Sequence, residues 1–223
     1  MEYFLGVLLA VSVLCDLHGY YVKSSVQQER QAEVIALGNW IIYLARMMNV
    51  GFAMVLAFLY ELQMPVRLSV IFFFGFFFAW IGSMVYLRSP AIEHWLCKAL
   101  GFLFYRPFPQ LRGNEYWRKV GYGVRVRWLS MMASAAFVYL ALLLPFLAAR
   151  LLPEFRMTVV FIGQLMNFMS TAILLAYIEP RMMQGLDRNA PQDEMDGFIS
   201  GRVMLVGCMA VLSFVWVVSF RSQ

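Results

Sequence analysis

The sequence predicts an all-α, polytopic membrane protein with six transmembrane helices, and three observations support this fold class. Hydrophobic residues make up 62% of the 223 residues, and only 14% are charged. The mean hydropathy is +0.69. Six separate stretches reach the roughly 20 mostly apolar residues that a membrane span needs. A soluble domain of this length cannot bury so much apolar surface, so the bilayer must solvate much of the chain.

The predicted spans cover residues 3–22, 34–60, 66–87, 127–149, 157–178 and 202–220. Pro65, Pro153 and Pro180 stand at their ends, where a missing amide hydrogen costs little. Because spans joined by short loops must pack against one another, we expect residues 1–223 to form a single transmembrane domain.

The first stretch is predicted to be a span and not a cleaved signal peptide. It begins Met-Glu, has no basic residue before its apolar run, and lacks a small-residue cleavage site before Asp16 and His18. It is therefore kept as the first transmembrane helix.

The basic residues predict the orientation of the chain. Most of them lie in the loops after the first, third and fifth spans, from Lys23 to Arg202. The positive-inside rule then makes those loops cytoplasmic and places both termini outside a bacterial cytoplasmic membrane. Because these charges stand beside apolar spans, membrane lipids are the expected partners and nucleic acid is not.

The long third loop is predicted to contain an interfacial amphipathic helix. Ser89 and Pro90 are typical of a helix N-terminus. Apolar residues then recur at helical spacing, namely Ile92, Trp95, Leu96, Ala99 and Leu103. With Lys98 and Arg106 beside it, such a helix suits the headgroup region. We interpret it as an anchor for the fold in preference to a substrate contact.

Arg46 is the main candidate functional residue, because it stands near the middle of the second span. An arginine stays charged in a protein, and a charge deep in a span is a functional hypothesis by default. Asn39, Tyr43 and Asn49 lie three or seven residues from it, on the same face of the helix. The pattern predicts a polar stripe that points into the bundle.

Other spans supply polar residues that can meet this stripe. Asp16 and His18 begin a polar half of the first span that ends at Lys23. In the fifth span Gln164 and Asn167 share a face with Thr171, and Ser170 is adjacent. If these faces converge, the bundle encloses a hydrated cavity with a fixed positive charge, which suits a phosphate or pyrophosphate.

A purely structural interpretation stays open beside this one. Arg46 and Asp16 have similar predicted depths and can pair as an interhelical ion pair with no ligand. Gln164 and Asn167 can equally serve as hydrogen bonds between membrane helices.

Enzymatic function is not expected. The sequence has no G-x-S-x-G, H-E-x-x-H, P-loop or dinucleotide-binding motif. The acidic residues Asp187, Asp193, Glu194 and Asp196 lie together and are interpreted as a solvated turn in preference to a metal site. We therefore expect no catalytic residue, no metal and no cofactor.

Several runs of the sequence resemble the Amj family of lipid II flippases. They are Asp16-Leu-His-Gly-Tyr-Tyr-Val-Lys23, Leu37-Gly-Asn39-Trp, Ala45-Arg46-Met-Met-Asn49, Leu174-Leu-Ala-Tyr-Ile-Glu179-Pro180, Leu186-Asp187, Gly201-Arg202 and Gly207. Six spans and a long third loop also agree. Glu179 and Lys23 stand where an aspartate and an arginine are expected, so a relative that moves another lipid-linked saccharide fits as well.

The resemblance implies a flippase for an undecaprenyl-pyrophosphate-linked cell-wall precursor. Arg46, with Asn39, Asn49 and Gln164, is then expected to receive the pyrophosphate. Asp16, Lys23, Asn167 and Glu179 complete the predicted substrate site. A non-catalytic scaffold of a cell-envelope complex is the alternative, and an intramembrane phosphotransferase or hydrolase using residues 187–196 is a third reading. Whether the protein forms a homo-oligomer is left open.

Overall fold

The computed structural model describes residues 1–24, 31–62, 64–88, 126–151, 156–187 and 191–219, and they form helices without strands. The helices are α1 (Glu2–Ser24), α2 (Gln31–Glu61), α3 (Leu68–Arg88), α6 (Val126–Leu151), α7 (Arg156–Ile173), the π-helical turn η3 (Leu174–Ile178), α8 (Glu179–Asp187) and α9 (Pro191–Ser219). Within these described residues, six helices are long and apolar enough to cross a membrane. The all-α, multi-pass fold class is therefore confirmed, while the helix predicted after Ser89 lies outside the described residues.

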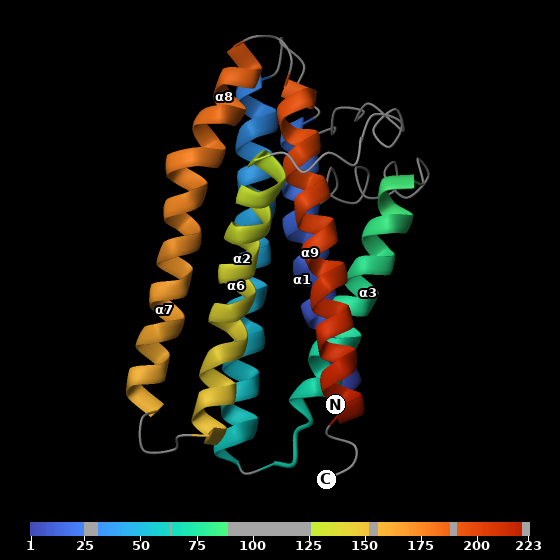
Figure 1. Cartoon of the computed structure of the whole chain (residues 1–223), viewed down its shortest axis with the longest axis vertical. Coiled ribbons are helices and arrows are strands. Elements are labelled where there is room, and N and C mark those ends of the chain that lie inside the picture. The colour runs from blue at the N-terminus through green and yellow to red at the C-terminus, as the bar shows by residue number, and fades with distance from the viewer. Residues whose placement is uncertain (25–30, 63, 89–125, 152–155, 188–190, 220–223) are drawn as a thin grey trace.

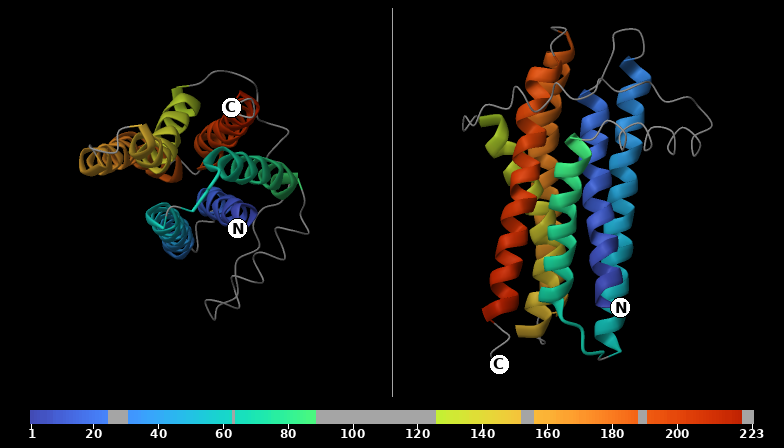
Figure 2. Two further views of the ribbon diagram at one scale, coloured as in Figure 1. Left: turned by 90° about the horizontal axis from the view of Figure 1, so that it is seen from below. Right: turned by 90° about the vertical axis from the view of Figure 1, so that its right-hand side faces the viewer.

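The helices run along one long axis, and the start of α1 and the end of α9 lie at the same end of the bundle (Figure 1). Helix α1 packs against α2, α3 and α9, and α6 packs against α7 and α9. Seen from below, α6 and α7 form a pair on one side and α2 lies beside α1 (Figure 2). Since α2 has little contact with α6, the packing between these two sides of the bundle is slight.

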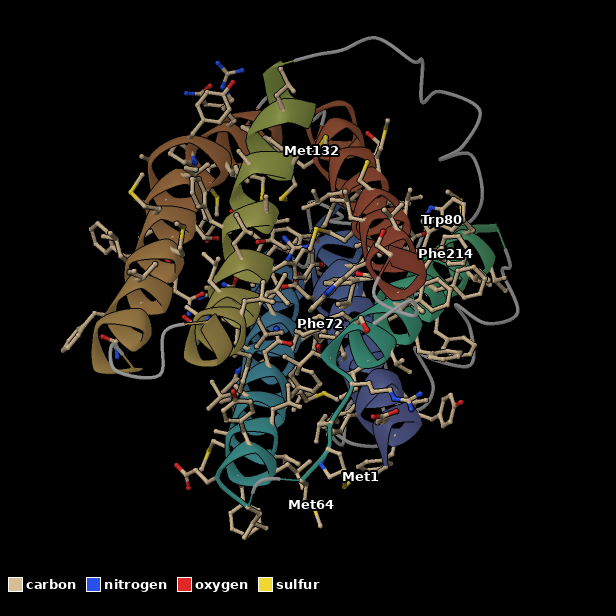
Figure 3. All side chains as sticks on the ribbon, turned by 60° about the horizontal axis from the view of Figure 1, so that its bottom comes forward. Met1, Met64, Phe72, Trp80, Met132 and Phe214 are labelled. Atoms are coloured by element: carbon tan, nitrogen blue, oxygen red, sulfur yellow. The ribbon has the colours of Figure 1, made fainter. Side chains whose placement is uncertain are left out.

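The core has two parts along the bundle axis. The part nearer the start of α1 contains Phe72, which is 1% exposed and lies among the helices (Figure 3). Phe72 stacks on Phe76, and Phe76 meets Tyr139 of α6 edge to face. The part nearer α8 joins residues of α1 and α2 to Ile178 and Phe198. The candidate site lies where these two parts meet.

The ends of the last two spans differ from the prediction. The fifth span was expected to end before Pro180, but the helix continues through η3 and α8 to Asp187. The sixth was expected to begin at Arg202, but α9 begins at Pro191. Hence Asp193, Glu194 and Asp196 lie in a helix and not in a loop. Hydropathy marks where the apolar stretch begins, and a helix can start earlier in polar sequence.

The π-helical turn explains how the helix passes Pro180. A proline inside a helix lacks the N–H for the carbonyl four residues earlier, and its ring crowds that carbonyl. In η3 the N–H of Glu179 donates to the carbonyl of Leu174, five residues back. This wider turn accommodates the proline and keeps the chain helical.

Helices α1 and α2 approach closely at two glycines. A Cβ on Gly19 would lie 2.6 Å from Cγ1 of Ile42 and 2.8 Å from the carbonyl oxygen of Gly38. A Cβ on Gly38 would lie 2.8 Å from the carbonyl oxygen of Gly19. Small residues are what allow such contact between membrane helices.

Gly19→Ala is therefore expected to destabilise the bundle by about 1–3 kcal/mol, because the new methyl group meets backbone that cannot move without separating the helices. The melting temperature of the purified protein in detergent measures this. Gly51→Ala is the matched control, since a Cβ there meets nothing within 4 Å. Equal melting temperatures for the two variants would contradict the close approach.

Candidate functional site

A polar cavity lies at the centre of the bundle, between five helices and η3. It is lined by Val13, Asp16, Tyr20, Arg46, Asn49, Ser134, Val138, Tyr139, Ser170, Leu174 and Arg202. Two guanidinium groups and one carboxylate give its ionisable residues a net charge of one positive. Its volume of about 20 Å³ has room for roughly one water molecule. Any larger ligand therefore requires the helices to separate.

Arg46 is the middle residue of α2, which puts it about 22 Å from either end of that helix. A hydrocarbon core about 30 Å thick and centred on α2 would place this guanidinium near mid-depth. Arg46 is half-buried and lines the cavity. Among the residues that the structure describes, no carboxylate forms an ion pair with it. The charge is thus available to a ligand from the cavity.

Asp16 pairs with Arg202 of α9, and not with Arg46. Asp16 is 7% exposed and Arg202 is 4% exposed, so both members of this ion pair are buried. The interhelical pair between Arg46 and Asp16 that the sequence left open is therefore wrong, and so is the placement of Arg202 in a cytoplasmic loop. The reason is the early start of α9, which carries Arg202 into the bundle.

Residue Arg202 was missed as a site residue although the sequence contains a signal for its depth. Pro191 suits the first position of a helix, and the acidic residues after it suit the first turn. A helix begun there holds Arg202 three turns from its start.

The ring of Tyr20, which lines the cavity, contacts two cations. Its ring centre lies 5.1 Å from Cζ of Arg202 and 5.6 Å from Nζ of Lys23, within the range of cation–π contacts. Lys23 is only 4% exposed, although it was predicted to end the first span at the interface. Glu179 and Arg46 both lie near enough to interact electrostatically with Tyr20 and Lys23. Lys23 and Glu179 thus flank the cavity without lining it.

The polar stripe of α2 reaches the cavity only in part. Asn49 lines it, and its side-chain oxygen accepts a hydrogen bond of 2.7 Å from the Ser12 hydroxyl. Asn39 is half-buried and is not among the lining residues. Tyr43 is 59% exposed. Arg46 and Asn49 therefore belong to the inner face of α2, and Tyr43 does not.

The polar face predicted for the fifth span does not turn into the bundle. Gln164 and Asn167 are exposed, so this part of the expectation is wrong. Helix α7 packs on α6 through small residues: Ser170 hydrogen-bonds Ser134 over 3.1 Å, and Gly163 faces Pro145. This contact rotates Gln164 and Asn167 outward. Their role in binding substrate stays a prediction.

His18 lies beside the cavity and not in it. Its Nδ1 hydrogen-bonds the hydroxyl of Tyr86 on α3, and both rings are buried. His18 is two residues from Asp16 and therefore projects from a different face of α1. This pair ties α1 to α3 and leaves the cavity to Asp16 and Tyr20.

Comparison with known proteins adds no assignment: no protein-family model, curated protein or solved structure matches the chain.

Proposed function

We propose that this protein moves a lipid-linked anion across the membrane, and that the anion is an undecaprenyl-pyrophosphate-linked cell-wall precursor such as lipid II. The observation that carries the proposal is the Arg46 guanidinium, which lines a polar cavity from the middle of α2 and has no carboxylate partner among the residues that the structure describes. A charged side chain within a membrane span costs free energy, and a bound anion would offset that cost.

The charge of the cavity supports an anionic headgroup. Pyrophosphate oxygens accept paired hydrogen bonds from a guanidinium, and such charge-assisted bonds are the strong ones. The hydroxyl and amide groups of Ser134, Ser170 and Asn49 offer further hydrogen-bond partners. Without a polar path, bringing this headgroup through hydrocarbon costs many kcal/mol.

The packing supports an opening between α2 and α7. Helix α2 packs mainly on α1, and α7 mainly on α6, so parting them disturbs little core. Both helices expose apolar side chains that suit contact with an isoprenoid tail, namely Trp40, Met47 and Phe58 on α2 and Phe161 and Phe168 on α7. On α7 these stand beside the exposed amides of Gln164 and Asn167. In this mechanism the headgroup passes through the cavity while the tail stays in lipid.

The membrane assignment completes the proposal. A cell-wall precursor is made at the cytoplasmic membrane, where the loop charges favour both termini on the outside. The start of α1 and the end of α9 lie at one end of the bundle, which is compatible with that orientation. The chain's own residues act by binding, so no catalytic step is assigned.

Purified protein in lipid vesicles is expected to move a labelled undecaprenyl-pyrophosphate lipid from the inner to the outer leaflet. Protection of the label from a membrane-impermeant reagent measures this. Expression is also expected to rescue cells that lack their usual lipid II flippase. Vesicles that behave like empty ones, together with failed rescue, would support the scaffold alternative.

A further inference from the structure

The guanidinium of Arg202 has more hydrogen-bond donors than acceptors around it. It carries five N–H groups and stays charged. One terminal nitrogen pairs with Asp16, and the other donates to the sulfur of Met131 over 3.5 Å, which is a weak acceptor. The buried Nε has no hydrogen-bond partner in the described part of the chain. A buried donor without an acceptor costs free energy, so an acceptor oxygen placed against Nε of Arg202 would stabilise this site.

The position of Arg202 makes it the counterpart of Arg46. Both line the same cavity, from α9 and α2. The ring of Tyr20 lies 5.1 Å from Cζ of Arg202 and supports the guanidinium whichever acceptor it has. A phosphoryl group between the two arginines brings several acceptor oxygens and matches their charge.

We infer that Arg202 is a second phosphate-binding residue and that Asp16 is its internal competitor. In the unliganded protein the Asp16 carboxylate forms an ion pair with the Arg202 guanidinium, and a phosphoryl group that enters the cavity replaces the carboxylate. The exchange rests on the proposed function and adds to it the identity of the second cation and the means of release. A carboxylate that competes for the same guanidinium keeps binding reversible, which a transporter needs.

Binding of two probes to the full-length protein in detergent tests this inference: inorganic pyrophosphate, and undecaprenyl pyrophosphate in micelles. Asp16→Asn keeps the shape of the side chain but removes the competing charge, so the affinity should rise about tenfold, or about 1.4 kcal/mol. Arg202→Gln should abolish that gain when combined with Asp16→Asn. Glu61→Gln, at the exposed end of α2, is the control and should bind like the unmodified chain.

The two probes separate the sources of the phosphoryl group. Tighter binding of the lipid alone assigns the site to a lipid headgroup, and tighter binding of both assigns it to the phosphoryl group itself. If Asp16→Asn raises the affinity for inorganic pyrophosphate alone, the exchange of Asp16 for a phosphoryl group is supported and the lipid substrate is contradicted. If the affinity for neither probe rises while vesicles still move lipid, the inference fails and the proposed function is unaffected.

If Asp16→Asn does not fold, the conservative variant Arg202→Lys provides a second test. Arg202→Lys keeps the positive charge but loses the planar fork. It is expected to weaken the binding of the probe that the unmodified chain binds, and unchanged affinity would overturn the inference.

Discussion

Arg46→Gln is expected to slow lipid translocation in vesicles by at least about a hundredfold. Hydrogen bonds to charged groups contribute about 1.5–3 kcal/mol each, and a paired contact from one guanidinium supplies two. Losing about 3 kcal/mol at the highest barrier corresponds to about a hundredfold in rate. The measurement is the rate at which a labelled undecaprenyl-pyrophosphate lipid becomes accessible outside the vesicle.

This loss is expected without loss of fold, because Arg46 is half-buried and has no ion pair among the described residues. Arg67→Gln is the matched control: it removes an exposed arginine near the end of the bundle and should leave transport unchanged. Arg46→Lys should retain part of the rate, since it keeps the charge and loses the fork. Transport by Arg46→Gln at the rate of the unmodified chain would remove Arg46 from the mechanism.

The helices could be predicted from sequence because each span is a long apolar stretch between charges. The starts and ends predicted for the first four spans fall within three residues of α1, α2, α3 and α6. The last two could not be bounded this way. Polar residues after Pro191 and around Pro180 hide helical segments from hydropathy, and the π-helical turn needed at Pro180 leaves no apolar signal.

The sequence predicted those site residues whose distance from the ends of a span is enough to place them inside the bundle. Arg46 and Asp16 were placed in the interior by their distance from the span ends, and both line the cavity. Which residues face each other depends on helix rotation, and sequence spacing fixes only which residues share a face. Gln164 and Asn167 therefore share a face as predicted, but the contact of Gly163 and Ser170 with α6 turns that face outward.

A charge-exchange experiment can distinguish a ligand-binding role for Asp16 and its partner from a purely structural ion pair. The identity of that partner decides which two residues are exchanged. Because Asp16 pairs with Arg202, the informative exchange is Asp16→Arg with Arg202→Asp. Each single change places like charges together in a buried site. Breaking a buried pair in this way is expected to cost about 3–5 kcal/mol.

The double exchange is expected to restore most of that stability but less than about a tenth of the translocation rate. It re-forms the pair with its charges reversed, and stability returns because the two changes compensate each other. Transport does not return, because the second guanidinium then projects from α1 and no longer lies against Tyr20 opposite Arg46. The melting temperature in detergent and the vesicle rate measure the two effects separately. If translocation recovers together with stability, Asp16 and Arg202 serve only as a structural pair, and the binding role assigned to Arg202 is contradicted.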